Sequence, residues 1–187
     1  DIKARVGLEN VVYGRCHGLE IEGLGLRFRH PKANSRSPQL AGAARVLARQ
    51  AERFPGALLE RKGLSVSLHY RRVPPSRRGH LLDLAAGMAR QAPGLMILPG
   101  KNVLEFLPRV NWGKGEAVLW IKKRLARTLR PRPALTVYTG DDITDEAAFA
   151  ALEGHGVTVR VGAHRGRADY AVKNVKAVHA LLRWLAR

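Results

Sequence analysis

The chain has 187 residues, which is enough for one domain or for a core with a smaller inserted domain. Its hydrophobic content of 45% is ordinary for a globular protein, and its one cysteine, Cys16, excludes an intrachain disulfide and favours a reducing compartment. No apolar run approaches the roughly 20 residues that span a bilayer, so we expect a soluble cytoplasmic protein without a membrane partner.

The formal net charge of +18 raises the question of a nucleic-acid partner, because clustered Lys and Arg release counterions from phosphates. The charges, however, are spread along the chain, with local runs only at 71–78 and 122–132. No zinc-finger spacing, aromatic RNA-binding signature or basic zipper accompanies them. Such runs are more typical of solvated helix faces and loops. We therefore do not expect nucleic acid as the partner, although the positive field would attract an anionic substrate.

The first part of the chain predicts a few short elements. Residues 1–8 are typical of the end of a helix, and residues 11–13 predict a short strand. Residues 16–21 predict the continuation into a second strand. Residues 27–38 are polar and irregular, so we interpret them as a linker.

The next seventy residues predict a helix followed by a hairpin, twice over. Apolar residues recur at helical spacing and end at Pro and Gly, and each helix precedes two short β-rich runs. In the second of these runs, Ser65, Ser67 and His69 alternate with apolar residues, which predicts one buried face and one wet face. Such a unit is a compact α+β domain. The predicted helices are 40–54 and 78–91, the latter burying Leu81, Leu84, Ala85 and Met88, and the predicted strands are 58–61, 64–70, 95–98 and 103–107.

After Pro108 the pattern changes to alternating helices and strands. A helix opens at Lys114, a buried strand is expected at 135–138, and two further strands are expected at 157–161 and 168–172. Asn174 caps a last helix. This alternation predicts a parallel, doubly wound sheet. The helix from Lys114 should bury Val118, Ile121, Leu125 and Leu129, and the last helix should bury Val175, Val178, Leu182 and Leu185.

Together these patterns predict an α/β fold: a Rossmann-like core interrupted by an α+β insert. We place the first core segment at 1–29, the insert at 30–107 and the second core segment at 108–187.

An acidic cluster follows the strand at 135–138. Gly140 breaks the strand, and Asp141, Asp142 and Asp145 come within the next five residues. Carboxylates crowded at a strand end repel one another unless a cation lies among them, and hard oxygens without Cys or clustered His suit Mg²⁺ rather than zinc. The motif alone leaves an alternative open, because Asp is equally typical of a turn with a helix cap. In that case Thr144 or Asp145 caps the next helix.

Lys114 lies between two glycines at the start of a helix. Small neighbours let the backbone approach an anion, and the helix N-terminus adds partial positive charge. A lysine at this place can bind a phosphoryl group and a neighbouring carboxylate as a point charge. Taken alone, Lys114 is more typical of an exposed lysine at an ordinary helix start.

Five short motifs stand in an order that is known from one enzyme family. The chain resembles the haloacid dehalogenase superfamily of phosphotransferases, in its branch with an α+β cap, and more closely the trehalose-6-phosphate phosphatases. The resemblance covers nearly the whole chain. The motifs are His17-Gly-Leu-Glu-Ile21, Leu59-Glu-Arg-Lys-Gly-Leu-Ser65 with His69-Tyr-Arg71, Val103-Leu-Glu-Phe-Leu-Pro108, Lys114-Gly115 and Gly140-Asp-Asp-Ile-Thr-Asp-Glu146.

The resemblance implies roles for the residues of the second core segment. Asp141 would ligate Mg²⁺, with Asp142 and Asp145 completing or orienting the coordination shell. Lys114 would hold the transferred phosphoryl group and the nucleophile in register. We therefore expect Lys114 and Asp145 to be catalytic and Asp141 and Asp142 to bind the metal.

The resemblance also implies a sugar-binding set. Glu60, Lys62 and Glu105 would project from the cap onto sugar hydroxyls, and His17 and Glu20 would lie at the boundary of core and cap. Two alternatives stay open: a lone His before Gly is often a satisfied structural group, and a Glu-x-Lys hairpin tip is often solvated. Cys16 stands where Asn or Ser is commoner in the family, and we interpret it as a small buried filler.

One departure from the family pattern concerns the nucleophile. The family's DxDGT-type motif, whose leading Asp attacks phosphorus, and its Ser/Thr phosphate-binding motif do not occur in the 187 residues. A truncated piece or a natural variant without catalysis would explain this, and we expect truncation, with this chain inactive by itself.

The resemblance therefore predicts a phosphatase that converts trehalose 6-phosphate to trehalose and phosphate through an aspartyl-phosphate whose nucleophile lies outside this chain. Alternatives are a phosphatase for sucrose phosphate or mannosyl-phosphoglycerate, and a non-catalytic basic module that binds nucleic acid or forms the tail of a trehalose-phosphate synthase. A synthase is also a conceivable partner.

Overall fold

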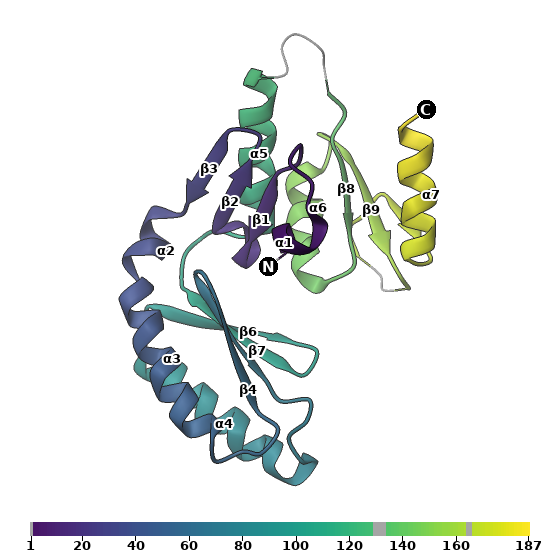
Figure 1. Ribbon diagram of the computed structural model, residues 1–187. Coiled ribbons are helices and arrows are strands. Elements are labelled where there is room, and N and C mark those ends of the chain that lie inside the picture. Colours follow the sequence, from purple (N-terminus) through teal and green to yellow (C-terminus); the bar gives the residue numbers. More distant parts are fainter. Residues whose placement is uncertain (1, 129–133, 164–165) are drawn as a thin grey trace. The chain divides into compact units, whose positions relative to one another are not determined.

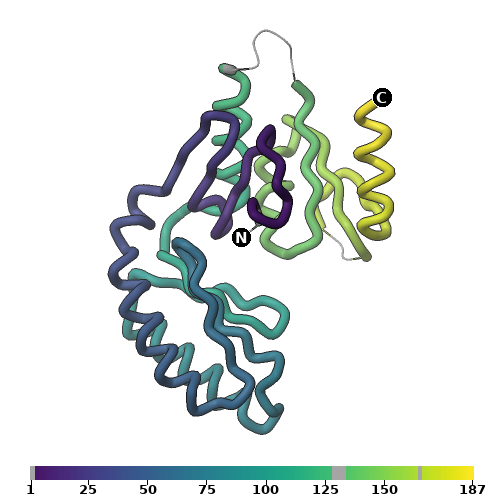
Figure 2. The backbone as a smooth tube through the Cα atoms, viewed as in Figure 1, coloured from purple at the N-terminus to yellow at the C-terminus, as the bar shows by residue number. Residues whose placement is uncertain are grey.

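A computed structural model describes residues 2–128, 134–163 and 166–187. The chain divides into two compact units, Asp1–Asn111 and Trp112–Arg187, whose backbones run from purple to teal and from green to yellow in Figure 2. In the described ranges no helix is long and apolar enough to cross a membrane. The predicted boundaries of core and insert, at 1–29, 30–107 and 108–187, stay a prediction.

The first unit begins with a short helix and a small antiparallel sheet. Helix α1 (Ile2–Val6) precedes three strands in the order β1-β2-β3. The strands are β1 (Tyr13–Arg15), β2 (Glu20–Gly23) and β3 (Leu26–Arg29). The end of a helix predicted at 1–8 is confirmed.

The predicted strands near Tyr13 are shifted in the structure. The strand expected at 11–13 begins at Tyr13, and the first three residues of the run 16–21 form a 3-10 turn, Cys16–Gly18, instead of a strand. The physical reason is local: Cys16 and His17 have φ of 51° and 57°, which no strand accommodates.

The linker predicted at 27–38 is wrong. Most of this range belongs to β3, to helix α2 (Pro31–Ser35) and to the start of helix α3 (Ser37–Ala51). Arg27 and Arg29 are exposed while Leu26 and Phe28 are half-buried, so the arginines lie on the solvent-exposed face of a strand. The His30 ring caps α2 by accepting a hydrogen bond from the Ala33 N–H at 3.2 Å.

The two predicted helix-hairpin pairs are confirmed. They form one antiparallel sheet in the order β4-β5-β7-β6, with α3 and α4 packed against it (Figure 1). The core between helices and sheet consists of buried apolar side chains such as Leu47, Leu81, Leu68 and Phe106. The elements after α3 are β4 (Leu58–Lys62), β5 (Ser65–His69), α4 (Pro75–Gln91), β6 (Leu95–Gly100) and β7 (Val103–Pro108).

The prediction that one face of β5 is solvent-exposed is wrong in part. Ser65 and Ser67 are only 1% and 4% exposed, because β5 lies between β4 and β7 and its second face meets the turn that carries Cys16. In α4, Leu81 and Ala85 are buried as predicted, whereas Leu84 and Met88 are only half-buried.

The second unit contains the predicted parallel sheet, in the order β10-β9-β8. Phe149 and Leu152 of α6 and Val159 of β9 form its buried core. Asn174 caps the last helix, as predicted, by accepting a hydrogen bond from the Ala177 N–H at 3.2 Å. The elements are α5 (Lys114–Thr128), β8 (Val137–Gly140), a 3-10 turn η2 (Ile143–Asp145), α6 (Glu146–Leu152), β9 (Val157–Val161), β10 (Tyr170–Val172) and α7 (Val175–Leu185).

Burial in this unit is lower than the sequence predicts. The strand expected at 135–138 is not buried: Leu135 is 69% exposed, and β8, which begins at Val137, is an edge strand among the described strands. The apolar face of α7 is likewise open, with Val175 and Leu182 exposed and Val178 half-buried. Along α5, Val118, Ile121 and Leu125 are half-buried, and the burial predicted for Leu129 lies outside the described residues.

Candidate active site

Asp145 is the centre of the polar site in the second unit. The residue is 3% exposed, and its Oδ1 accepts hydrogen bonds from Lys114 Nζ at 2.7 Å and from the Tyr138 hydroxyl at 2.6 Å. Its Oδ2 accepts from the backbone N–H groups of Asp141 and Asp142, at 3.1 and 2.9 Å. A buried carboxylate is stabilised only when it is paired and hydrogen-bonded in this way.

Gly140 and Gly115 let the backbone come close enough to build this site. A Cβ at Gly140 would lie 2.4 Å from Cγ of Asp145, and a Cβ at Gly115 would lie 2.6 Å from the carbonyl oxygen of Ala147. Gly140 therefore lets the turn fold over the carboxylate, and Gly115 lets α5 lie against α6, which brings Lys114 to Asp145.

The electrostatics of the site favour an ionised Asp145. Burial by itself raises the pKa of this carboxyl, but the hydrogen bonds from Lys114, Tyr138 and the Asp142 N–H outweigh burial, so the pKa lies below its usual value. Burial and the bond to Asp145 raise the pKa of Tyr138, which therefore stays a hydrogen-bond donor. Lys114 pairs with a neighbouring carboxylate, as predicted, and that carboxylate is Asp145. The Lys114 side chain remains 28% exposed.

The three carboxylates of the predicted metal site do not converge. Asp142 caps the 3-10 turn, its Oδ1 accepting from the Ile143 N–H at 2.6 Å. Asp145 occupies the N-cap position of α6, as one of the two predicted caps, but its side chain makes no capping bond to that helix. Asp145 turns toward Lys114. Within the described residues, no group of three or more His, Cys, Asp or Glu side chains could hold a metal ion.

The donors that are present fit Mg²⁺ only as part of a coordination shell. The Asp141 carboxylate is exposed and makes no hydrogen bond or ion pair to any described residue, and its hard oxygens suit Mg²⁺. Asp142 and Asp145 use their oxygens to hold the loop that presents Asp141. The chain therefore offers one free carboxylate and a supporting layer around it.

A second polar pair in this unit escaped the sequence analysis. Arg160 is 6% exposed, forms an ion pair with Glu146 and lies over the Phe149 ring, 5.4 Å from its centroid. The other Glu146 oxygen accepts from the Arg167 N–H at 3.0 Å. The signal was an arginine in the middle of an apolar strand, Val157-Thr-Val-Arg-Val161, which demands a buried partner.

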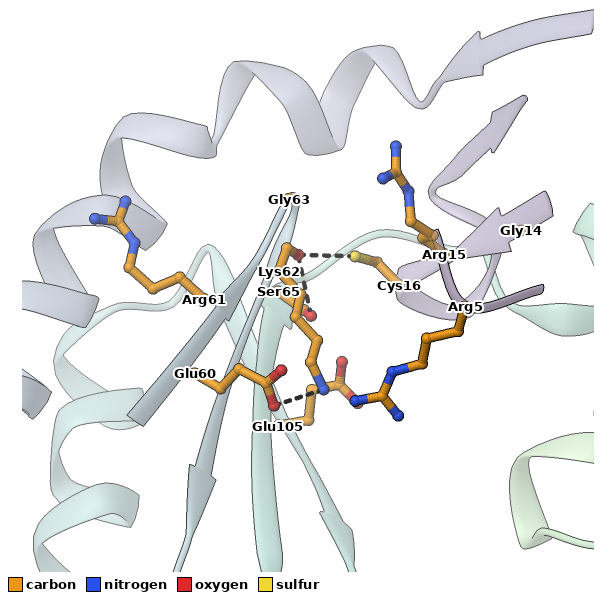
Figure 3. A pocket seen from close by; sticks show the side chains of 10 residues that line it. All are labelled: Arg5, Gly14, Arg15, Cys16, Glu60, Arg61, Lys62, Gly63, Ser65 and Glu105. Atoms are coloured by element: carbon orange, nitrogen blue, oxygen red, sulfur yellow. Dashed lines mark hydrogen bonds and ion pairs between the residues drawn. The ribbon is translucent and has the colours of Figure 1, made fainter. Parts of the chain in front are cut away.

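The first unit contains a cavity of about 830 Å³, shown in Figure 3. Three of the predicted sugar-binding residues, Glu60, Lys62 and Glu105, line it. Lys62 Nζ lies 2.7 Å from Glu60 Oε2, which also contacts His69 Nε2 at 3.1 Å. The cavity therefore has carboxylate acceptors and an ammonium donor from two neighbouring hairpins, β4-β5 and β6-β7.

The other two predicted residues, His17 and Glu20, do not line the cavity. His17 Nε2 contacts Glu105 Oε2 at 3.0 Å, so it supports a lining residue. Glu20 pairs with Arg29 Nε at 3.2 Å and lies against the Gly63 turn, where an added Cβ would be 2.0 Å from its Oε2. Burial raises the pKa of Glu105, but the hydrogen bonds from His17 and Ser65 outweigh it and lower the pKa.

Sequence reasoning missed the basic lining of the cavity. Arg5 and Arg15 line it from the first segment, and Arg61 lines it from β4. Figure 3 shows Arg5 extending into the cavity, whereas Arg61 turns away from Glu60. Arg5 lies outside the recognised motifs and Arg15 lies just before one of them, whereas Arg61 lies inside the motif 59–65 but was given no role.

Cys16 lies at the rim of this cavity. Burial raises the pKa of its thiol, which suits the predicted role of a small filler better than that of a nucleophile. The residue is half-buried rather than fully buried, and its Sγ donates to the Lys62 carbonyl oxygen at 3.0 Å.

Replacing Cys16 by Asn should raise the melting temperature, because Asn tolerates the positive φ of 51° better than Cys does. The left-handed conformation costs an ordinary residue about 1–2 kcal/mol, so we expect a rise of roughly 2–4 °C in a thermal melt. Cys16→Ala is the matched control, since it keeps the strain and loses the thiol contact. A Cys16→Asn protein that melts below Cys16→Ala would contradict the expectation.

The chain is similar to known proteins. The family model described as Trehalose-phosphatase matches residues 2–178 of the chain. The chain belongs to the trehalose-phosphatase family. It is 36% identical over 162 residues to the trehalose-phosphate phosphatase of Mycobacterium tuberculosis (strain ATCC 25618 / H37Rv), which covers 86% of this chain and 41% of the relative. The chain thus spans about two fifths of the length of the curated trehalose-phosphatases that it matches.

Solved structures of trehalose-phosphatase type share the fold. A trehalose-6-phosphate phosphatase related protein superposes with a TM-score of 0.76 at 24% identity, over 90% of this chain and 69% of that chain. The C-terminal domain of C. albicans trehalose-6-phosphate phosphatase gives 0.71 at 22% identity, over 99% and 73%. Together with the family match, these superpositions confirm the predicted fold class, an α/β core with an inserted α+β cap.

Proposed function

We propose that the complete protein hydrolyses trehalose 6-phosphate to trehalose and inorganic phosphate. The observation that carries the proposal is the pair of half-buried Lys114 and buried Asp145, at 2.7 Å, in a chain that matches the trehalose-phosphatase family over residues 2–178. A lysine held by a buried carboxylate at the start of a helix is suited to bind a phosphoryl group, since its charge is fixed in place before substrate arrives.

Lys114 and the acidic loop would act on the phosphoryl group. Lys114 would bind the phosphoryl oxygens and reduce their repulsion of the attacking carboxylate, an Asp that we place outside this chain. Asp141 would contribute a ligand to Mg²⁺, and Asp142 and Asp145 would hold its loop through the cap and the paired backbone N–H bonds. Mg²⁺, when bound, would neutralise charge that develops on the phosphoryl oxygens.

The proposed reaction has two steps, and in each step one bond to phosphorus forms while another breaks. The attacking carboxylate forms a bond to phosphorus while the bond from phosphorus to the sugar oxygen breaks, and the sugar oxygen takes up a proton. Water then cleaves the aspartyl-phosphate, releases inorganic phosphate and restores the carboxylate.

The cavity of the first unit would bind the disaccharide. Glu60 and Glu105 would accept hydrogen bonds from sugar hydroxyls, and Lys62 would donate to them. His17 would keep the Glu105 carboxylate in place through the 3.0 Å contact. Glu20, which does not line the cavity, would act through the Gly63 turn that leads from Lys62 into β5.

Phosphate release from a panel of sugar phosphates tests the proposal. The complete protein should release phosphate from trehalose 6-phosphate at least tenfold faster, in kcat/KM, than from sucrose phosphate or mannosyl-phosphoglycerate, because a site whose polar groups match the hydroxyls of one sugar leaves some of them unpaired with another. Faster hydrolysis of either other sugar phosphate would favour that substrate instead. Absence of release from all of them would overturn the proposal.

Replacing Glu105 by Ala should raise KM for trehalose 6-phosphate and spare a small aryl phosphate such as p-nitrophenyl phosphate. The loss of a charged hydrogen-bond acceptor predicts a rise of roughly tenfold to a hundredfold for the disaccharide. Steady-state kinetics on both substrates provide the measurement, with Glu52→Ala, an exposed carboxylate at the end of α3, as the matched control. Equal losses on both substrates would remove Glu105 from the sugar site.

Two further expectations stay proposals. A trehalose-phosphate synthase is a conceivable partner, since it would supply the phosphorylated disaccharide, and co-purification of the complete protein with such a synthase would test this. A cytoplasmic location follows from the expectation that Cys16 is kept reduced, and fractionation of cells would test it.

A further inference from the structure

Tyr138 is joined to the phosphate-binding lysine through a single carboxylate oxygen. Its hydroxyl donates to Asp145 Oδ1 at 2.6 Å, and Lys114 Nζ donates to the same oxygen at 2.7 Å. Lys114 and Asp145 lie in the family motifs of the chain, whereas Tyr138 lies in β8, just before the acidic motif, and had no assigned role.

The Tyr138 ring is itself held in place. It packs edge-to-face against Phe149, with ring centroids 5.7 Å apart and an interplanar angle of 84°. Phe149 is 2% exposed and belongs to the core of the second unit, so the hydroxyl of Tyr138 is presented from a rigid position.

The other side of Asp145 is fixed as well. Its Oδ2 accepts the backbone N–H groups of Asp141 and Asp142 at 3.1 and 2.9 Å, so the carboxylate plane is determined by donors on both oxygens. Without the tyrosine, Oδ1 would keep only the Lys114 ammonium, and the carboxylate would draw that charge more fully to itself. Sharing Oδ1 between two donors leaves more of the ammonium's charge for a third group.

We propose that Tyr138 is a positioning residue that acts through Asp145 to keep the Lys114 ammonium aimed at, and available to, the phosphoryl group. The proposal rests on the phosphatase function proposed above and adds to it a residue that touches neither sugar nor phosphate. Tyr138 affects the phosphoryl step, so its effect is the same for every phosphate monoester.

Tyr138→Phe tests the proposal in the complete protein, because Phe keeps the ring against Phe149 and removes only the hydroxyl. The loss of one hydrogen bond to a charged group predicts a fall in kcat of about tenfold or somewhat more. We expect the same fall for trehalose 6-phosphate and for p-nitrophenyl phosphate, with KM for the sugar phosphate changed less than about twofold. Tyr170→Phe, the same change on exposed strand β10, is the control and should leave kcat unchanged.

A double-mutant cycle separates positioning from a merely structural role. In a Lys114→Gln background the ammonium is gone, so Tyr138→Phe should change the residual kcat less than about twofold. A tenfold loss in both backgrounds would show that the tyrosine acts independently of Lys114 and would overturn the proposal. A lowered melting temperature with an unchanged kcat would overturn it too.

A binding measurement keeps this test independent of turnover. The affinity for inorganic phosphate, measured by calorimetry, should fall about fivefold in Tyr138→Phe and should not fall further in the Lys114→Gln background. If the wild-type protein releases no phosphate from any sugar phosphate, the proposed function fails, and calorimetry still decides the role of Tyr138. Equal phosphate affinity in wild type and Tyr138→Phe would refute the positioning role.

Discussion

Replacing Asp141 by Asn should abolish Mg²⁺-dependent phosphate release by the complete protein. Asp141 carries the only carboxylate of the acidic loop that no described residue engages, so it is the group that can ligate an ion. An amide oxygen has no net charge, and the loss of several kcal/mol of transition-state stabilisation corresponds to roughly a thousandfold or more in kcat. Phosphate release measured across a range of Mg²⁺ concentrations is the readout.

Asp142→Asn is the matched control for this experiment. Asn caps a helical turn about as well as Asp, so the Ile143 N–H keeps its acceptor and the melting temperature should stay unchanged. We expect kcat to fall less than about tenfold, since the Asp142 carboxylate holds the loop and is not free to ligate the metal ion. Unchanged turnover in Asp141→Asn would remove Asp141 from the metal site, and equal abolition in both variants would extend the site to Asp142.

Lys114→Ala should lower kcat roughly a hundredfold to a thousandfold, which is the usual effect of removing one preorganised donor to a developing negative charge. The loss should be equal for trehalose 6-phosphate and for p-nitrophenyl phosphate, because Lys114 is proposed to bind the phosphoryl group. Lys123→Ala, an exposed lysine in the middle of the same helix, is the control and should retain full turnover. Retained activity in Lys114→Ala would exclude a role in phosphoryl transfer.

The same substitution should destabilise the protein, and the effect should depend on pH. Asp145 would keep three hydrogen bonds but lose its cation, which predicts a loss of about 2 kcal/mol at neutral pH, or roughly 4–8 °C in melting temperature.

The direction of the pH dependence follows from the lowered pKa of Asp145. A carboxyl with a folded-state pKa below its unfolded value of 3.8 contributes stability that is present above that value and lost as pH falls through the folded pKa. Without Lys114, one of the interactions that offset burial is lost, so the pKa of Asp145 rises. The deficit of Lys114→Ala relative to wild type should therefore be largest near pH 7 and shrink toward pH 4. A deficit that grows on acidification, in melts recorded across this range, would contradict the assigned ion pair.

Secondary structure was predictable where one periodicity covers a whole element. The helices near 40–54 and 78–91 and the strand 157–161 have apolar residues at helical or strand spacing, and Asn174 carries its own capping signal. Each of these features depends on neighbours along the chain. The structure places them within a few residues of the expected bounds.

The predictions of secondary structure and burial were wrong where a contact from a distant part of the chain determines the structure, or where the local backbone conformation is unusual. Strand β3 was interpreted as a linker because its two arginines make the segment appear polar, although they alternate with the apolar residues Leu26 and Phe28. Ser65 and Ser67 were expected to be solvent-exposed, but both are buried in β5, which lies between β4 and β7, and Cys16 contacts Ser65. That turn depends on two consecutive positive φ angles, at Cys16 and His17, for which the residue types give no signal.

The candidate site divides in the same way. The resemblance of five ordered motifs to the family indicated Lys114, Asp141, Asp145, Glu60 and Glu105, whereas the acidic motif and Lys114, each taken alone, left an ordinary structural alternative open. The order could not show which oxygens are free. In the structure Asp145 faces Lys114 and Tyr138, Asp142 caps a turn and Glu20 lies behind the Gly63 hairpin.

By itself, then, the amino-acid sequence determined the kinds of element, their order and the chemical groups available to a phosphatase of this family. Only the tertiary structure decided how those groups are shared: Asp145 with a tyrosine and a lysine, Glu105 with His17, and Arg160 with Glu146. The physical reason is that helix and strand periodicities arise from contacts a few residues apart, whereas a buried charge is stabilised by partners that the chain brings back from tens of residues away.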